Sequence, residues 1–529
     1  MMKKITKLFS LITGFSLLCG CTKVPNYSEP DITQSSSEES NSQSRPSVEY
    51  NEADIREFPV QQNDFIAKLN AESSVHDGAL SNTGEFDESG FVILREGNTM
   101  EHILMANTTQ FYRIVLAARS ETGASVTLKV DGNVLGTYYI PKREPNEDGS
   151  FPFEYSEVDC LYFTAGTNNL KFVVESGSVD IDYILAESSE RVSDEPYEVY
   201  SASANPYCSL KVIETMSYFS EIYGKFVLTA QNVSPGSNAE IDAVFRATGR
   251  YPAIRSGEIA YATLDTDEDK ERVKAETDIA VGYCEAGGLQ SYTWHWYSPN
   301  TSQSTDAGDF KLDLALENQI VEELASMTDT EITALTQNGI ITSEAAALLR
   351  DIDKLAEFFK PFDEADAVIL FQPLPEGDSG KYWWGKNAED YKKLWTLVFE
   401  RLCSYHKIHS LIWVWNGSDT EYYPGSQYVD IIGQSFFESS DSSFASRFKA
   451  LGSIFPSPKV MAVSDCDVMP NIDHMYRDNA IWLWTAPASG DYTLNMNGAL
   501  SESYNSVAYM KNFYNHKKTI TLDELPDFE

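Results

Sequence analysis

Residues 367–373 read "AVILFQP", a run of mostly apolar side chains that is followed by the turn-forming residues "LPEG" at 374–377. A continuous apolar run of this length is typical of a strand that is buried on both faces, as in a parallel sheet. Seven further runs of this kind occur in the same part of the chain: "KFVLTA" (225–230), "YPAIR" (251–255), "SYTWHW" (291–296), "SLIWVW" (410–415), "VDIIGQSF" (429–436), "VMAVSD" (460–465) and "AIWLWT" (480–485).

Amphipathic helices are predicted between these runs. In "EDYKKLWTLVFERL" (389–402) the large apolar residues recur at intervals of three and four and share one helical face, and "SEAAALLRDIDKLAEFF" (343–359) behaves in the same way. Strands and helices that alternate eight times predict a (β/α)8 TIM barrel over residues 207–515. Residues 516–529 are then predicted to be a C-terminal tail.

The segment before the barrel has a different pattern. Residues 58–188 contain short alternating runs such as "SVTLKV" (125–130), "LKFVV" (170–174) and "VDIDYIL" (179–185), and turn signals such as "DGN" and "AGTNN" separate them. Helical periodicity is weak there. The chain is therefore predicted to be multidomain, with an all-β, jelly-roll-like sandwich followed by the barrel.

The first residues have the composition of a targeting segment. Lys3, Lys4 and Lys7 precede a short apolar core, which is followed by "LLCGC" (17–21). The stretch resembles a bacterial lipoprotein signal, which implies a signal peptide at 1–20 and lipid attachment to the thiol of Cys21. An ordinary signal peptide is the alternative. The serine- and acid-rich residues 21–57 are predicted to be a disordered tether, so that the protein is expected on the bacterial cell surface, lipid-anchored and extracytoplasmic.

The net charge of the chain limits the classes of molecule that it can bind. The sequence has 80 acidic and 40 basic residues, a formal net charge of -40, which argues against binding to nucleic acid or to an anionic membrane surface. A membrane contact is expected only through the lipid at Cys21. A neutral polysaccharide or oligosaccharide would not be repelled. The remaining cysteines lack metal-type spacing and are interpreted as mostly buried thiols.

Chemistry in a TIM barrel occurs at the carboxyl ends of the strands. Two predicted strands end at carboxylates, Glu376 and Asp465, and a third ends near His295. Glycoside hydrolysis needs such a pair of carboxyl groups, one to protonate the leaving oxygen and one to attack or to activate water. It needs no catalytic cofactor.

Tryptophans at the same ends could stack on sugar rings, whose C–H faces are apolar. The candidate substrate-binding residues are His295, Trp294, Trp383, Trp384, Trp415 and Trp484. The alternatives stay open at this point: Trp383 and Trp384 could be packing residues, His295 could be structural, and a carboxylate after a strand could cap a helix.

Four motifs in the barrel segment make it similar to glycoside hydrolase family 26: "GG" with "YTWHW" (287–296), "PLPEGDSGKYWWG" (373–385), "YYPGSQYVDIIG" (422–433) and "VMAVSDCDVMPNID" (460–473). The resemblance implies an endo-β-mannanase-like enzyme in which Glu376 is the acid/base catalyst, and it puts Asp465 at the position of the nucleophilic glutamate.

The chain departs from the family pattern at several of these positions. The residues that stand where the family has others are Gln372, Pro375, Lys381, Ser435, Phe437 and Asp465 itself. An aspartate reaches about one C–C bond less than a glutamate, and an error of about 1 Å can cost about a hundredfold in rate. Two classes of function therefore stay open: a surface glycosidase that acts on β-mannan, and a degenerate barrel that binds glycans without turnover.

The β-rich segment resembles a carbohydrate-binding module of the family 6 or 35 type. The resemblance rests on "AKLNAE" (67–72), "FYRIVLAAR" (111–119), "TLKVDGNVLGT" (127–137) and "AGTNNLKFVVESGSVDIDYILAES" (165–188). It implies a structural calcium held by Glu72 and Asp182, because calcium prefers hard oxygen ligands. The alternative is that both are ordinary surface acids.

Overall fold

The computed structural model describes residues 64–528 except 82–89, 141, 144, 147, 300–302, 439 and 456–457. The predicted signal peptide, Cys21 and the predicted tether at 21–57 lie outside these residues. In the part of the chain that is described, no helix combines the length and the apolar character that are needed to cross a bilayer.

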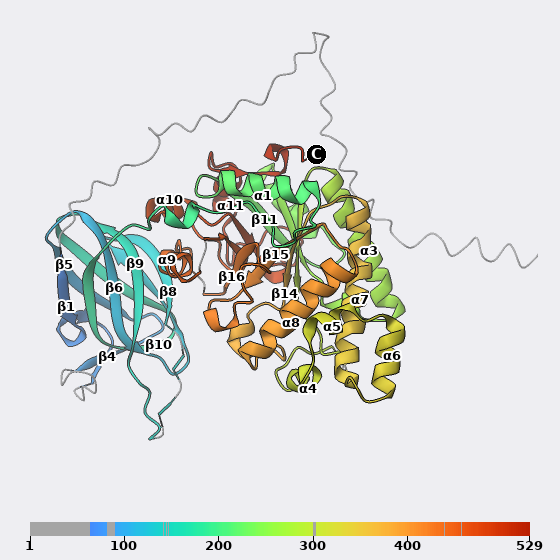
Figure 1. The fold of residues 1–529 in the computed structure, drawn as a ribbon. Helices are drawn as coiled ribbons and strands as arrows, with labels where there is room; N and C mark the ends of the chain where they lie inside the picture. Colours follow the sequence, from blue (N-terminus) through green and yellow to red (C-terminus); the bar gives the residue numbers. More distant parts are fainter. Residues whose placement is uncertain are drawn as a thin grey trace, which may run out of the picture. The chain divides into compact units, whose positions relative to one another are not determined.

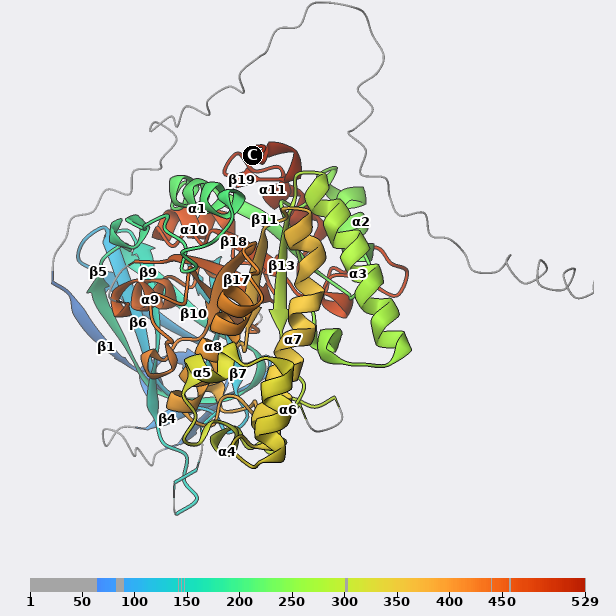
Figure 2. The same ribbon diagram turned by 45° about the vertical axis from the view of Figure 1, so that its right-hand side comes forward.

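Eight parallel strands form a closed barrel (Figures 1 and 2). Each strand pairs with the next in sequence, and β11 pairs with both β12 and β18, which closes the sheet. The strands are β11 (Val227–Val233), β12 (Ile254–Glu258), β13 (Leu289–Trp294), β14 (Ile369–Pro373), β15 (Leu411–Asn416), β16 (Ile431–Phe436), β17 (Val460–Cys466) and β18 (Trp484–Pro487). Each of the eight runs predicted from the sequence overlaps one of these strands, although β12 and β18 begin only near the end of their runs, and the barrel prediction is confirmed.

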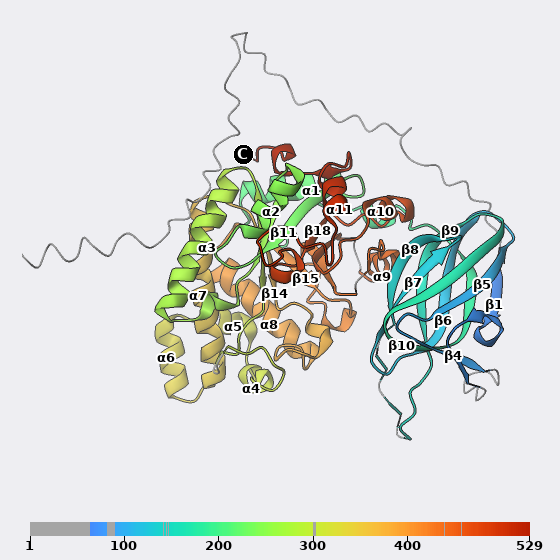
Figure 3. The ribbon, with the colours of Figure 1, turned by 180° about the vertical axis from the view of Figure 1, so that it is seen from behind.

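Helices surround the barrel, as Figures 1 and 3 show for α3, α7 and α8. Residues of β14 are buried throughout, as the continuous apolar run predicts. The helices are α1 (Leu210–Ile222), α2 (Ala239–Thr248), α3 (Asp267–Glu285), α4 (Leu312–Leu316), α5 (Val321–Ser326), α6 (Asp329–Gln337), α7 (Ser343–Glu364), α8 (Ala388–Glu400), α9 (Ala445–Ile454), α10 (Ile472–Asp478) and α11 (Val507–Tyr514). A π-helical turn, Arg401–Tyr405, continues α8.

The end of the chain belongs to the barrel. The two-residue strand β19 (Thr519–Ile520) pairs in parallel with β11, so the segment predicted as a tail adds to the sheet. Cys403 and Cys466 are buried free thiols, whereas Cys208 and Cys284 are free and partly exposed.

The segment before the barrel consists of antiparallel strands. They form two sheets that share β10, and apolar residues such as Leu116, Leu128 and Ile184 fill a common core. The strands are β1 (Ile66–Asn70), β2 (Val75–His76), β3 (Ala79–Ser81), β4 (Phe91–Arg95), β5 (Thr99–Ala106), β6 (Gln110–Arg119), β7 (Ala124–Val130), β8 (Asn133–Ile140), β9 (Glu154–Phe163) and β10 (Gly166–Ser189).

One detail of this segment differs from the sequence prediction, and a second agrees with it. The runs at 170–174 and 179–185, read as separate strands, are both part of β10, which continues through two register shifts. The "DG" at 131–132 joins β7 to β8 with positive φ at both residues, 48° and 85°, as a tight hairpin turn requires.

Candidate active site

Glu376 projects from a strained turn directly after β14. Leu374 and Glu376 both have φ of 51°, in the left-handed region that non-glycine residues rarely adopt. The amide of Glu376 donates to the carbonyl oxygen of Asn416 at 2.9 Å, at the end of β15. Gly377 is required next, since a Cβ there would lie 2.3 Å from the Tyr391 ring. The turn therefore holds the Glu376 carboxylate at the carboxyl end of the barrel.

Asp465 lies near the end of β17, and its carboxylate accepts a hydrogen bond of 3.0 Å from Asn232 Nδ2 on β11. Burial raises the pKa of Asp465 to about 7. His295 opposes this rise in pKa, whereas the carboxylates of Glu376 and Glu258 add to it. The structure thus brings Glu376, Asp465 and His295 within electrostatic reach of one another at one end of the barrel.

His295 follows β13 and is held by Glu258, the last residue of β12. Its Nδ1 forms an ion pair with Glu258 Oε2, and its backbone amide donates to Glu258 Oε1 at 3.1 Å. Burial by itself would lower the pKa of His295, but the carboxylates of Glu258, Glu376 and Asp465 outweigh burial and raise it. The three carboxylates therefore favour the protonated form of this imidazole.

Glu258 is a site residue that the sequence analysis missed. The apolar run "YPAIR" ends at Arg255, but β12 continues through Ser256 and Gly257 to Glu258. The signal that could have found it is the rule used for the other strands, that the residue at the carboxyl end faces the mouth. The apolar pattern stops at Arg255, so the sequence analysis placed the end of this strand three residues too early.

A cavity of about 570 Å³ adjoins Glu376. It is lined over the ends of β15 and β16 by Asn416, Gln434 and Ser435, and Arg447 of α9 forms part of its wall. Lys381 places its Nζ 3.7 Å from Glu376 Oε2, with a side chain that is 70% exposed. The acid/base candidate therefore borders a polar, open space in which hydroxyl groups of a sugar could find hydrogen-bond partners.

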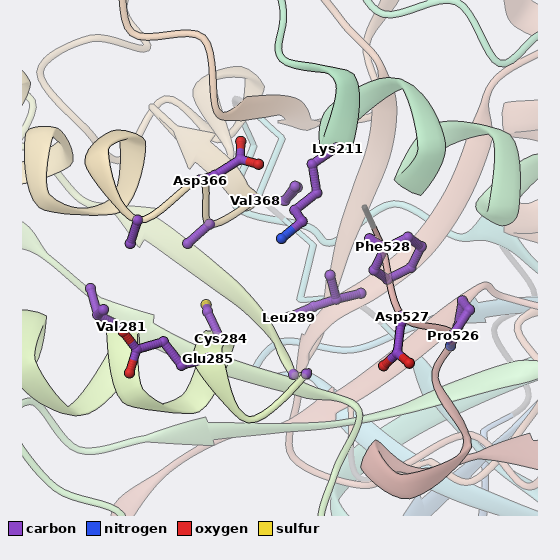
Figure 4. A pocket seen from close by; sticks show the side chains of 14 residues that line it. Lys211, Val281, Cys284, Glu285, Leu289, Asp366, Val368, Pro526, Asp527 and Phe528 are labelled. Atoms are coloured by element: carbon purple, nitrogen blue, oxygen red, sulfur yellow. The ribbon is translucent and has the colours of Figure 1, made fainter.

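A second cavity, of about 350 Å³, lies at the opposite end of the barrel (Figure 4). Leu289, the first residue of β13, lines it together with Lys211, Cys284 and Asp527. The side chains of Lys211 and Asp527 extend toward this space in Figure 4. It is separate from Glu376 and Asp465, because the amino and carboxyl ends of barrel strands are on opposite faces.

The predicted sugar-stacking role of the tryptophans is wrong in this structure. Trp294, Trp383, Trp384, Trp415 and Trp484 are each at most 1% exposed, so none offers a ring face to a ligand. The physical reason is that each indole ring packs against another aromatic ring of the protein. Trp294 stacks on Trp296 at 4.3 Å between ring centroids, and Trp484 packs on Phe219 of α1, outside the barrel.

The two tryptophans after Glu376 stabilise the turn itself. Trp383 Nε1 donates to the carbonyl oxygen of Trp296 at 2.7 Å, and Trp384 Nε1 donates to that of Pro375 at 3.1 Å. Tyr382 stacks on Trp384 with 4.5 Å between centroids and 11° between planes. Trp383 and Trp384 thus fix the loop that carries Glu376, and they touch no open surface.

Tyr382 is the half-buried ring that covers Trp384 on the cleft side. Burial raises the pKa of Tyr382 to about 12, and the carboxylates of Glu376, Glu258 and Asp465 add to this effect. Its ring centroid is 5.5 Å from that of His295. Sequence reasoning passed over Tyr382 in favour of its tryptophan neighbours.

Two of the family departures, one buried and one half-buried, lie in the wall of the site. Gln372 is 2% exposed, and its Nε2 donates to Thr293 Oγ1 at 3.3 Å. Ser435 accepts a hydrogen bond of 2.8 Å from Asn416 Nδ2. By contrast, Phe437 is 46% exposed, and its ring packs against Tyr492. These residues keep the wall polar and packed but supply no charge to the carboxylates.

Glu72 and Asp182 are neighbours in the β-rich segment. Glu72 follows β1 in a 3-10 turn (Ala71–Ser73), and Asn70 pairs with Tyr183, next to Asp182. Asp182 is fully buried, and Glu72 Oε2 is a buried oxygen without a hydrogen-bond partner among the described residues. The alternative of two surface acids is therefore wrong for Asp182. Carboxylate oxygens are the ligands that calcium prefers, although no cluster of three or more His, Cys, Asp or Glu occurs in the described part of the chain.

Comparison with known proteins identifies the family. A mannan endo-1,4-beta-mannosidase of Thermothelomyces thermophilus is 27% identical over 391 residues, which cover 73% of this chain and 76% of that protein. The crystal structure of a Podospora anserina GH26-CBM35 beta-(1,4)-mannanase has the same fold, with a TM-score of 0.53, 23% identity and coverage of 88% of this chain and 100% of that one.

A beta-mannanase from a symbiotic protist of the termite Reticulitermes speratus, solved with gluco-manno-oligosaccharide, matches with a TM-score of 0.51 and 23% identity, over 62% of this chain and 98% of that one. The family model for glycosyl hydrolase family 26 matches residues 204–524. This span contains all eight barrel strands with Glu376 and Asp465 at their carboxyl ends. The chain therefore belongs to glycosyl hydrolase family 26, a family of glycoside hydrolases.

Proposed function

We propose that the protein hydrolyses β-1,4-linked mannan, with Glu376 as the acid/base and Asp465 as the second carboxylate. The observation that carries the proposal is that these two carboxylates lie at the same end of a family 26 barrel. The choice of mannan rests on the relatives, whose names describe mannan endo-1,4-beta-mannosidases.

The environment of each carboxylate suits a different role. Glu376 borders the open cavity and can deliver a proton to a glycosidic oxygen there. Asp465 is held by Asn232, and the nearby His295 acts to lower the pKa of Asp465, which favours the ionised carboxylate when a positive charge develops on the sugar. A short side chain at this position favours a wider separation of the carboxyl groups, which leaves room for a water molecule.

A glycan-binding protein without turnover is the second candidate, and a specific observation favours it. The pKa of Asp465 is about 7, so a large share of this carboxyl group is protonated at neutral pH and can neither attack nor act as a base. Gln372 and Pro375 supply no charge that would lower this pKa. In this case the same cleft would serve to hold a polysaccharide at the cell.

The remaining parts of the chain are proposed to serve attachment. Lipid at Cys21 would tether the protein to the bacterial surface, and residues 58–188 would form a β-sandwich that binds carbohydrate and holds calcium at Glu72 and Asp182. Support for the module comes from the fold match to the Podospora anserina GH26-CBM35 protein, which extends over 88% of this chain.

Product release from β-mannan, xylan and mixed-linkage glucan tests the function, with a binding assay for each glycan. Glu376→Ala should abolish turnover and leave binding intact, because the proton is needed mainly in the transition state. Glu389→Ala is the matched control, since Glu389 is on the outer helix α8 with a side chain that is 74% exposed. Binding without release by the parent would favour the second candidate, and release that survives Glu376→Ala would contradict the assigned roles.

Asp465→Glu restores the reach of the family's carboxylate. Asp465 is only partly buried, so the longer side chain can extend into the cleft. A correction of about 1 Å can raise the rate by up to about a hundredfold. An unchanged rate would show that the length of this side chain does not limit catalysis.

A further inference from the structure

Three aromatic side chains form a cluster at the carboxyl end of the barrel. The roles proposed for Glu376 and Asp465 do not involve this cluster. Phe437 and Tyr504 are 46% and 37% exposed, and Tyr492 between them is half-buried. The ring centroids of Phe437 and Tyr492 are 5.5 Å apart, and those of Tyr492 and Tyr504 are 4.7 Å apart. We call Phe437, Tyr492 and Tyr504 the aromatic triad.

Each member of the triad is tied to the segment that carries Asp465. Phe437 follows β16, in which Ser435 pairs with Asp465, and the carbonyl oxygen of Phe436 accepts a hydrogen bond of 3.1 Å from the amide of Asp467. The triad member on this strand therefore lies beside the end of β17.

Tyr504 is fixed through the next residue. Asn505 is 6% exposed, its Nδ2 donates to the carbonyl oxygen of Asp467 at 2.9 Å, and its Oδ1 accepts from the amide of Met469 at 2.9 Å. These two bonds clamp the loop that carries Tyr504 to the chain directly after Asp465.

Tyr492 is fixed from the other side. The hydroxyl of Thr493 accepts a hydrogen bond of 3.0 Å from Gln231 Nε2, and Gln231 precedes Asn232, the residue that binds Asp465. Burial raises the pKa of Tyr492, and Tyr504, Asp467 and Asp465 add to the effect, which agrees with this placement. The loop after β16 and the segment between β18 and α11 thus form one aromatic surface beside the end of β17.

We propose that the aromatic triad is a distal sugar-binding subsite, which holds a neutral β-linked hexose of the same glycan chain that is cleaved beside Glu376 and Asp465. The proposal rests on the proposed function and extends it. Exposed aromatic rings offer faces on which the apolar C–H faces of a pyranose stack, and the triad lies beside the segment that carries Asp465.

The surroundings define the chemistry of this ligand. The loops of the triad are hydrogen-bonded to the backbone of Asp467, so an anionic sugar such as a uronate would be repelled by this carboxylate. The cavity beside Glu376 is over the ends of β15 and β16, whereas the triad is over the ends of β16 to β18. A glycan that reaches both must extend over several residues, so the triad should affect long chains and leave short ones unaffected.

The test compares mannotriose with mannohexaose, using the full-length chain. Tyr492→Ala and Tyr504→Ala should each lower kcat/KM for mannohexaose about tenfold, mainly through KM, since the loss of a well-placed aromatic contact has about this effect on binding. Neither should change kcat/KM for mannotriose by more than about twofold. Tyr504→Trp, which keeps a ring, should restore the value for mannohexaose.

Tyr207→Ala is the matched control. Tyr207 is 68% exposed, and it precedes α1 near Ser209, whose amide bonds to His409 just before β15, at the opposite end of the barrel. It should leave both substrates unaffected. Circular dichroism of all variants separates a loss of fold from a loss of contact.

The outcomes distinguish this inference from the proposed function. In one outcome the parent hydrolyses both substrates while the triad variants lose kcat/KM equally for both, or lose none. This outcome overturns the proposed subsite and leaves the proposed function unaffected. Binding of mannohexaose without hydrolysis, weakened only by the triad variants, supports the triad and overturns hydrolysis. A parent protein that neither binds nor hydrolyses either glycan overturns both.

Discussion

Asp465 should make the stability of the barrel depend on pH in a way that its replacement by asparagine removes. In the folded protein the pKa of Asp465 is about 7, compared with its usual value of 3.8. Between these two pH values the unfolded chain has released the proton and the folded chain retains it. Since the folded state binds more protons, stability falls as the pH rises, and it levels off above about pH 7.

The size of this effect follows from the shift. A pKa that moves from 3.8 to about 7 corresponds to at most about 4 kcal/mol, because one pKa unit is about 1.36 kcal/mol. Asparagine resembles the protonated carboxyl group and does not ionise. The unfolding free energy of the parent minus that of Asp465→Asn should therefore decrease by up to about 4 kcal/mol between about pH 4 and pH 8.

Urea unfolding followed by circular dichroism at a series of pH values measures this difference. Asp313→Asn is the control for the loss of a carboxylate, because Asp313 is an exposed residue of α4, and Asp465→Asn should change the pH profile more than this control does. If parent and Asp465→Asn have parallel pH profiles, Asp465 does not retain its proton in the fold. Asp465 would then be ionised at neutral pH and available as a nucleophile.

Three further predictions concern other parts of the structure. Glu258→Gln should lower the pKa of His295, because the carboxylate that counteracts the pKa-lowering effect of burial is lost. An NMR titration of the imidazole that shows no decrease in pKa would contradict this. Arg401→Ala should reduce the unfolding free energy by about 3–5 kcal/mol, since it leaves Asp353 without the two hydrogen bonds of 2.6 and 2.7 Å. Replacement of both Arg401 and Asp353 by alanine should reduce the unfolding free energy by less than Arg401→Ala alone. An equal reduction would count against the ion pair. If calcium is bound at Glu72, a chelator should lower the melting temperature of the parent but not that of Glu72→Ala.

The barrel could be predicted from the sequence because its strands are buried on both sides. In "AVILF" (367–371) no polar residue interrupts the pattern, so the strand that precedes Glu376 is readable from the residues alone. β12 shows the limit of this approach. Arg255 is fully buried through a bidentate contact with Glu276, and polar residues follow it, so the strand continues where the apolar pattern ends.

The tryptophans show a second limit. A ring at the end of a strand can face the cleft or lie beneath a loop, and both positions have the same sequence pattern. Trp384 is covered by Tyr382, and this contact depends on a turn with positive φ at Leu374 and Glu376, which no local pattern of non-glycine residues predicts. The exposed rings at the mouth instead come from loops after β16 and β18, where periodicity carries no information.

The burial of the tryptophans has a spectroscopic consequence. The chain has nine tryptophans, all nine lie between residues 294 and 484, and each is at most 1% exposed. Buried indoles emit at short wavelength and are shielded from soluble quenchers such as acrylamide. Intrinsic tryptophan fluorescence is therefore a selective reporter of the barrel: a red shift on heating or in denaturant records the opening of that domain alone, while the β-rich segment, which contributes only tyrosine emission, can be followed separately in the same sample.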